Sequence, residues 1–271
     1  MKKFFTVIFA ALFVSALFCG EVQAKDIKFV QITDVHYTVQ NEYSGEALAG
    51  AIEEINKLEN VAFVIFTGDN IGSPRKDNLV GFVRTANKLN VPYYLVIGNH
   101  DVYKTNGMSK VNYIDIVKDN NILYKPSKPN YVFKKNGFVF IVVDGAKEII
   151  PGSIGYYRDS TLEWLDKQLK KYKKRPVIIC QHYPLIEPKE HKSHRTYQPE
   201  KYFEVLSKHK NVIAIISGHY HVNGEKMQDG IYHISTPALI NPPNYYKVID
   251  IVTTPGFSPM IYTELKSADV K

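Results

Sequence analysis

Apolar and polar positions alternate along the chain in two recurring patterns. Six short runs rich in Val, Ile and Phe are bounded by polar or turn residues, which is typical of buried β-strands. These runs cover residues 27–33, 61–67, 91–97, 138–144, 176–181 and 212–217. Between them, apolar residues recur at the spacing of an amphipathic helix at 47–55, 79–89 and 162–169. Ser160 with Glu163 predicts a capping box at the start of the third helix.

The order of these segments predicts one α/β domain. Residues 231–265 add strand-like segments, broken by the turn-forming stretches TPALINPPN and TTPGFSP. No internal repeat, low-complexity linker or shift in composition divides the chain. The 271 residues are 45% hydrophobic and 23% charged, which is the composition of a folded protein with a sizeable core.

The first 24 residues have the pattern of a secretory signal peptide. Two lysines precede an apolar run that is shorter than the ~20 residues of a membrane-spanning helix, and Val22 and Ala24 place small residues before a polar pair. We therefore predict a signal peptide at 1–24 and an extracytoplasmic domain, periplasmic or secreted, at 25–271. Two alternatives remain: the segment stays as a membrane anchor, or Cys19 carries a lipid. If residues 1–24 are removed, Cys180 is the single cysteine of the mature chain, which excludes an internal disulfide.

The net charge of +7 comes from 34 Lys and Arg against 27 Asp and Glu, spread along the chain. The densest run, KKYKK at 170–174, fits the solvated end of a helix. We expect no nucleic-acid partner, and the pattern indicates no particular oligomeric state.

The candidate chemistry lies where the strands end. Each group alone is an ordinary turn sequence, but the carboxyl ends of parallel strands gather at one edge of a sheet, where ligands bind. Five strands are followed in turn by Asp34 and His36, by Asp69 and Asn70, by Asn99, His100 and Asp101, by His182, and by His219 and His221.

These side chains offer oxygen and imidazole ligands without a thiolate. Such a set suits Mn, Fe or Zn. A carboxylate that bridges two ions can hold them roughly 3.5–4 Å apart, and a water shared by the ions loses its proton near neutral pH. That hydroxide would be the nucleophile, so no Ser, Cys or Thr need be activated.

The blocks DVH, GDN, GNHD, the lone His182 and GHYH resemble, in order and spacing, the signature blocks of the calcineurin-like metallophosphoesterases. The resemblance implies a four-layer α/β fold, in which two mixed β-sheets are flanked by helices, and a dinuclear centre of divalent or trivalent transition metals. The ligands that it implies are Asp34, His36 and His221 for one metal, Asn99, His182 and His219 for the other, and Asp69 as the bridge. His100 would be catalytic, stabilising the transition state or protonating the leaving oxygen. Asp101 would either orient its neighbours or stabilise the turn.

The segment GYYRDSTLEWLDKQL followed by HYP is similar to the small bacterial branch that includes the class III cyclic nucleotide phosphodiesterases. Purple acid phosphatases differ, because they carry an aromatic ligand near the position of Gly72. We therefore expect a metal-dependent hydrolase of small phosphate esters, a phosphodiesterase or a phosphatase. The alternatives are a catalytically silent scaffold of the same fold, which binds metal or a partner, and a metal-storage protein.

Two cationic segments are candidates for substrate binding. Residues 183–201 carry Lys189, His191, Lys192, His194 and Arg195 directly after a ligand strand. Arg195 could grip phosphate oxygens in a bidentate way, and this loop could close over a ligand; the other interpretation is a solvated polar loop. Arg75, six residues after Asp69, is a second candidate.

Overall fold

The computed structural model describes residues 24–191 and 193–270. The predictions on residues 1–23, Cys19 included, and the side chain of Lys192 lie outside these described ranges. Within the ranges, no helix has the length and apolar character that crossing a bilayer requires.

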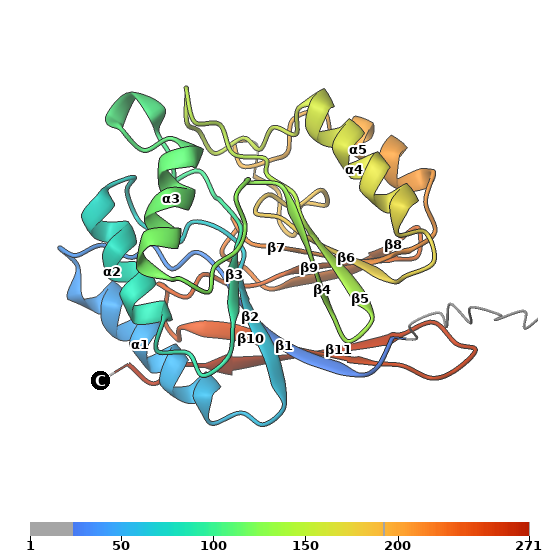
Figure 1. Ribbon diagram of the computed structural model, residues 1–271, viewed down its shortest axis with the longest axis horizontal. Helices are drawn as coiled ribbons and strands as arrows, with labels where there is room; N and C mark the ends of the chain where they lie inside the picture. The colour runs from blue at the N-terminus through green and yellow to red at the C-terminus, as the bar shows by residue number, and fades with distance from the viewer. Residues whose placement is uncertain (1–23, 192, 271) are drawn as a thin grey trace, which may run out of the picture.

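Two mixed β-sheets pack against each other (Figure 1). The five-stranded sheet has the order β11-β10-β1-β2-β3, with β1, β2 and β3 parallel. The six-stranded sheet has the order β4-β5-β6-β7-β9-β8, with β5, β6, β7 and β9 parallel. The strands are β1 Ile27–Ile32, β2 Val61–Phe66, β3 Tyr93–Leu95, β4 Tyr131–Lys135, β5 Phe138–Val142, β6 Val177–Cys180, β7 Val212–Ser217, β8 Gly224–Gln228, β9 Ile231–Ser235, β10 Tyr245–Val252 and β11 Met260–Ser267.

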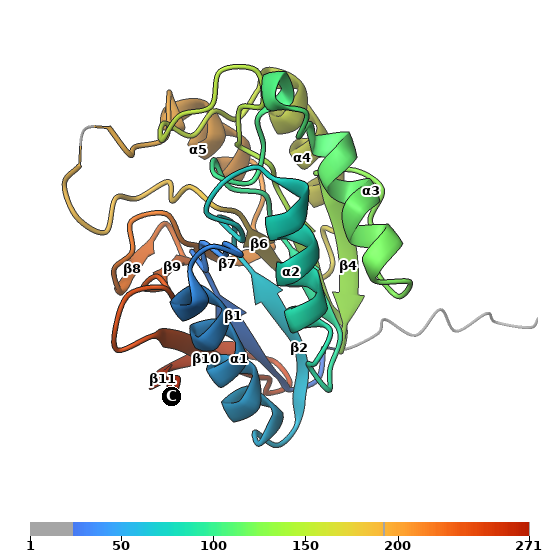
Figure 2. The same cartoon turned by 90° about the vertical axis from the view of Figure 1, so that its left-hand side faces the viewer.

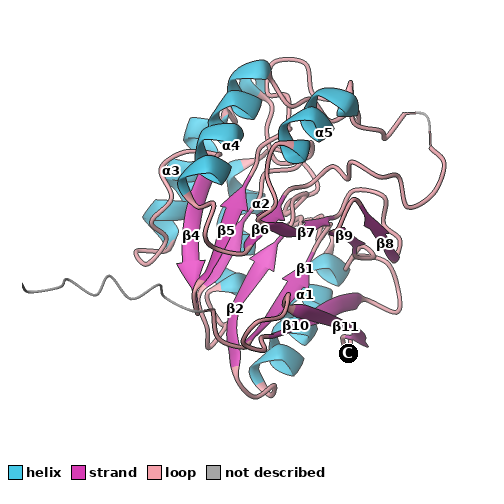
Figure 3. Ribbon diagram, turned by 90° about the vertical axis from the view of Figure 1, so that its right-hand side faces the viewer, coloured by secondary structure: helices cyan, strands magenta, loops and turns pink. Residues whose placement is uncertain are grey.

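Helices cover the outer side of each sheet. Helices α1, α2 and α3 lie against the five-stranded sheet, and α4 and α5 cover the six-stranded one (Figures 1 and 3). Their bounds are α1 Glu42–Asn56, α2 Lys76–Ala86, α3 Lys110–Asn120, α4 Asp159–Lys171 and α5 Pro199–Ser207, with a short 3₁₀ helix at Lys104–Asn106. The predicted four-layer arrangement is confirmed.

The central strands bury both of their faces. In β2, Phe63 and Ile65 point into the core between the sheets, while Val64 and Phe66 point toward the helices. In β5, Phe140 points into the core between the sheets and Ile141 points toward the helices. Burial on both faces explains why these strands are nearly continuous apolar runs rather than alternating ones.

The predicted capping box is wrong. Helix α4 begins at Asp159, and its N-cap is Arg158, whose side chain makes no capping hydrogen bond. The carbonyl of Arg158 accepts instead from the amides of Thr161 and Leu162, so Ser160 already lies inside the first turn. The sequence patterns also predict neither α3, whose apolar stripe is narrow, nor β4, which is half-exposed.

Two glycines of α1 give a matched test of how this helix packs against neighbouring segments. A Cβ on Gly45 would meet Tyr37 at an ordinary 3.6 Å, whereas a Cβ on Gly50 would lie 2.2 Å from the main-chain oxygen of Asp269. We expect Gly45→Ala to raise the free energy of unfolding by about 0.5–1 kcal/mol, because glycine is costly inside a helix. Gly50→Ala should lower it, because the C-terminal segment must move. Urea unfolding followed by circular dichroism measures both changes, and equal shifts would contradict the contact with Asp269.

Candidate metal centre

The predicted ligands converge at the carboxyl ends of the parallel strands of both sheets. The loops after β1, β2 and β3 bring four of them from the five-stranded sheet, and the loops after β6 and β7 bring three from the six-stranded sheet. In the same order, the seven are Asp34, His36, Asp69 and Asn99, followed by His182, His219 and His221.

Asp34, His36 and His221 form one potential metal site, with ligand atoms within 4.8 Å of one another. Oδ2 of the fully buried Asp34 accepts from the hydroxyl of Thr33 at 2.7 Å and from the amide of His219 at 2.9 Å. Oδ1 makes no hydrogen bond; it lies 3.2 Å from Nε2 of His221 and 4.0 Å from Nε2 of His36. The two ring nitrogens are 3.3 Å apart. A cation would satisfy all three atoms, so the residues present fit a metal.

Asp69, His182 and His219 form a second potential site. Main-chain carbonyls hold both rings: Nδ1 of His182 lies 2.8 Å from the oxygen of Thr67, and Nε2 of His219 lies 2.7 Å from the oxygen of Ser153. Because a carbonyl only accepts, each of these nitrogens carries its proton, and the other nitrogen of each ring is free to bind metal.

Asp69 lies between the two groups. Its Oδ2 is 3.3 Å from Nε2 of His182 and 3.9 Å from Nε2 of His36. Its Oδ1 accepts from the amide of His100 at 2.9 Å. Oδ1 of Asn99 is 3.3 Å from the same nitrogen of His182, so this amide oxygen faces the second group.

The electrostatics of the cluster favour a bound cation. Burial opposes ionisation of Asp34, but the adjacent ring of His221 and the charge of His182 lower its pKa to about 2. Burial likewise opposes ionisation of Asp69, and His182 holds its pKa well below the usual range. Burial would lower the pKa of His182, yet the two carboxylates raise it to about 9. Burial lowers the pKa of His219 to about 3, so that ring is neutral, as a ligand must be. The two carboxylates therefore keep His182 protonated, and a bound metal ion would supply the positive charge in place of that proton.

The backbone of the cluster is strained. Five of the predicted ligands have left-handed φ values of 47° to 72°, a conformation that costs of the order of 1–3 kcal/mol at a non-glycine residue. Asp and His tolerate it better than branched residues do. These five are Asp34, His36, Asp69, His219 and His221.

Glycine is required where the strand-end loops cross. A Cβ on Gly98 would lie 2.1 Å from Oδ1 of Asp69, and a Cβ on Gly218 would lie 2.5 Å from Oδ2 of Asp34. The absence of these side chains lets the two carboxylates approach the facing loops.

His100 lies at the exposed edge of the cluster. Its Nδ1 is 3.1 Å from the carbonyl oxygen of Gly72, and its ring meets that of His36 edge-on, with centroids 4.7 Å apart. It is also close enough to His36 and Asp69 to form a third group of potential ligands. The predicted non-ligand role of His100 stays a prediction.

Asp101 ties two loops together. It is fully buried and accepts from the amides of Gly98 at 2.7 Å and Ile71 at 3.0 Å, and from the side chain of Asn70 at 3.1 Å. Burial, reinforced by the charge of Asp69, raises its pKa to about 7. Of the two roles left open by the sequence, these contacts support turn stabilisation.

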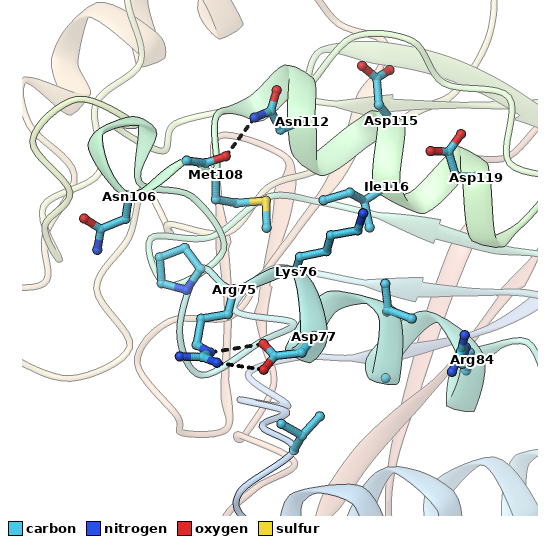
Figure 4. Close-up of a pocket in the computed structure, with 15 residues that line it drawn as sticks. Arg75, Lys76, Asp77, Arg84, Asn106, Met108, Asn112, Asp115, Ile116 and Asp119 are labelled. Carbon is cyan, nitrogen blue, oxygen red and sulfur yellow. Dashed lines mark hydrogen bonds and ion pairs between the residues drawn. The ribbon is translucent and has the colours of Figure 1, made fainter.

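The two candidate arginines, Arg75 and Arg195, are exposed. The guanidinium of Arg75 pairs with Asp77 at 2.8 Å, on a groove of about 1080 Å³ between α2 and α3 whose lining includes Lys76 and Met108 (Figure 4). The side chain of Arg195 is exposed, and its main-chain oxygen accepts from the amide of Gly155 at 3.2 Å. Their substrate-binding roles stay predictions.

The loop between β6 and α5 projects beside β8 (Figure 2) and is tied at its base. The hydroxyl of Thr196 donates to the oxygen of Pro184 at 2.8 Å, and the amide of Tyr197 donates to the oxygen of Gly155 at 2.8 Å. His191 and His194 of this loop stand beside His219. The sequence predicted both only as members of a cationic segment that could bind substrate. Their His-x-x-His spacing after a ligand strand was the signal that could have identified them as a pair.

Comparison with known proteins places the chain among phosphoesterases. A model of the calcineurin-like phosphoesterase family matches residues 27–223. A probable glycerophosphodiester phosphodiesterase GpdQ of Arcobacter nitrofigilis is 29% identical over 202 residues, 71% of either chain. A 3',5'-cyclic-nucleotide phosphodiesterase of Nostoc sp. is 22% identical over 221 residues, 78% of either chain. The structure of a dimetal phosphatase from Danio rerio superposes with a TM-score of 0.65 at 18% identity, covering 90% of this chain and 99% of that one, which shows the shared fold.

Asp69 and Asp101 should separate metal binding from loop stability. We expect Asp69→Ala to lower the metal content, because its carboxylate lies between both groups. Asp101→Asn should keep the metal content and lower the free energy of unfolding by about 1–3 kcal/mol, because an amide cannot accept all three hydrogen bonds equally well. Elemental analysis of dialysed protein, with thermal unfolding, measures both. Full metal content in Asp69→Ala would refute its place in the centre.

Proposed function

Because the chain belongs to the calcineurin-like phosphoesterase family, and is therefore a phosphoric ester hydrolase, we propose that it cleaves small phosphoric diesters at a dinuclear metal centre. The single observation that carries the proposal is the position of Asp69, whose Oδ2 faces His36 of one potential site and His182 of the other. A carboxylate in that position can bridge two ions.

The residues present also indicate which ions would bind. Asp34, His36 and His221 would hold one ion, Asn99, His182 and His219 the other, and Asp69 both. Oxygen and imidazole donors without thiolate favour Mn, Fe or Zn. When bound, two such ions supply Lewis acidity, which lowers the pKa of a shared water and neutralises charge on the phosphoryl oxygens.

The chain itself orients the ligands and provides a proton donor. The carbonyls of Thr67 and Ser153 fix His182 and His219 in the tautomers that leave one nitrogen free. The carbonyl of Gly72 can accept from Nδ1 of His100 whether that ring is neutral or cationic. In the cationic ring, Nε2 carries a proton that can pass to the departing alcohol oxygen.

Diesters are favoured over monoesters by the relatives. The names of the two relatives described above refer to glycerophosphodiesters and to cyclic nucleotides, and both are diesters. A silent scaffold is the weaker alternative, because the chain retains all seven predicted ligands and His100.

We further propose that the enzyme is exported. The cationic head, the apolar run and the small residues at 22 and 24 support removal of residues 1–24. The amide of Lys25, the first residue after that point, already donates to the oxygen of Asn136 at 2.8 Å, so the folded body would keep this contact after cleavage.

Processing can be checked on protein recovered from its native host. We expect the mature chain to begin at Lys25 and to fractionate outside the cytoplasm, as measured by N-terminal sequencing and intact mass. A chain that retains Met1 in the membrane fraction would contradict cleavage and favour an anchor, and a lipid-sized mass increase at Cys19 would favour lipidation.

Catalysis can be tested with bis(p-nitrophenyl) phosphate as the diester and p-nitrophenyl phosphate as the monoester. We expect turnover of the diester that chelation abolishes and Mn²⁺ restores. His100→Ala should keep the metal content and lose roughly 10²–10⁴ in kcat, the usual contribution of a positioned acid. The control is His209→Gln, which should behave as the parent. His209 follows α5 and pairs with Asp166 of α4. Metal-loaded protein without turnover of either ester would refute the proposal.

A further inference from the structure

A cavity of about 300 Å³ adjoins the metal centre under the loop between β6 and α5. This volume is at the lower end of the range of ligand sites. Two of its walls, His219 and His221, are candidate metal ligands, and none of its lining residues is acidic. The lining residues are Lys189, His191, His194, His219, Tyr220, His221 and Asn241.

Two histidines of the cavity are hydrogen-bonded to each other. Nδ1 of His191 lies 2.8 Å from Nδ1 of His194, and the hydroxyl of Ser193 lies within 3.1 Å of both nitrogens. At this distance one nitrogen must carry a proton and the other a lone pair. When both rings are neutral, the pair therefore has one Nε2 acceptor and one Nε2–H donor.

The pair is positioned through the same residue that holds a metal ligand. The hydroxyl of Ser153 donates to the main-chain oxygen of Ser193 at 2.5 Å, and the main-chain oxygen of Ser153 bonds Nε2 of His219 at 2.7 Å. The ring of His194 lies 4.9 Å from that of His219, centroid to centroid. The pair therefore lines the cavity directly beside a predicted metal ligand.

We propose that His191 and His194 form a subsite for the alcohol group of the substrate, and that this alcohol is a small polyol. The inference rests on the proposed diesterase function. A hydroxyl group both donates and accepts, so it matches the one donor and one acceptor of the pair. The amide of Asn241 and the ammonium of Lys189 extend the same polar lining.

Binding without turnover provides the first test. Calorimetry on metal-loaded protein compares glycerol 3-phosphate with methyl phosphate, which lacks the hydroxyl groups. We expect the parent to bind glycerol 3-phosphate at least about tenfold more tightly, the worth of one well-placed hydrogen bond of about 1.4 kcal/mol. His194→Ala and His191→Ala should bind the two ligands equally, while His209→Gln should keep the parent ratio. Equal affinities in the parent, or a ratio unchanged by both loop variants, would overturn the subsite.

Kinetics provides a second test that separates this subsite from the proposed function. With a glycerophosphodiester, His194→Ala should raise KM about tenfold and leave kcat within about twofold, whereas KM for bis(p-nitrophenyl) phosphate, whose ester groups carry no hydroxyl, should rise much less. An equal effect on both diesters, or loss of metal from His194→Ala, would overturn the subsite and give the histidine a structural role. A parent that hydrolyses no ester would refute the diesterase, and the calorimetric ratio would then still decide the subsite.

Discussion

The site depends on two ionised carboxylates that are buried side by side. Asp34 and Asp69 are almost inaccessible to solvent, and a buried carboxylate is tolerated only where opposite charge and hydrogen-bond donors surround it. The amides of His100 and His219 donate to them, and imidazole rings face the remaining oxygens. The close packing of polar groups at this edge, the glycines beside it and its strained turns all serve to hold these two charges.

Rigid layers on both sides make such a concentration of strain tolerable. The ligands stand on short turns at the ends of strands whose two faces are both packed in apolar cores, so the turns cannot relax without disturbing a core. The loops are also bonded to each other, as Asp101 shows for those after β2 and β3. Pre-organised ligands of this kind are what metal-dependent chemistry requires.

The two functions of the site are built from different kinds of structure. The predicted metal ligands come from strand ends, whereas the groups proposed to meet the substrate, His100 and the pair of His191 and His194, lie at the exposed edge or on a long loop. Loops vary without cost to the cores, so one metal centre can serve many esters. Ser153 connects the two parts, because its carbonyl holds the predicted metal ligand His219 while its hydroxyl bonds the loop.

The sequence by itself determined the α/β class and the candidate ligands, because the strands and the polar residues after them follow from local pattern. The four-layer arrangement was implied by the family resemblance. Apolar runs buried on both faces identify strands, and the polar residues directly after them must gather at one sheet edge. Only the tertiary structure decided the contacts between distant segments. It gave Asp101 three donors from two loops and brought Ser153 to His219, 66 residues along the chain. The predicted capping box at Ser160 failed for a local reason, because α4 already begins at Asp159. Periodicity records which face of an element is buried, but the partner of a polar atom depends on how the segments pack in space.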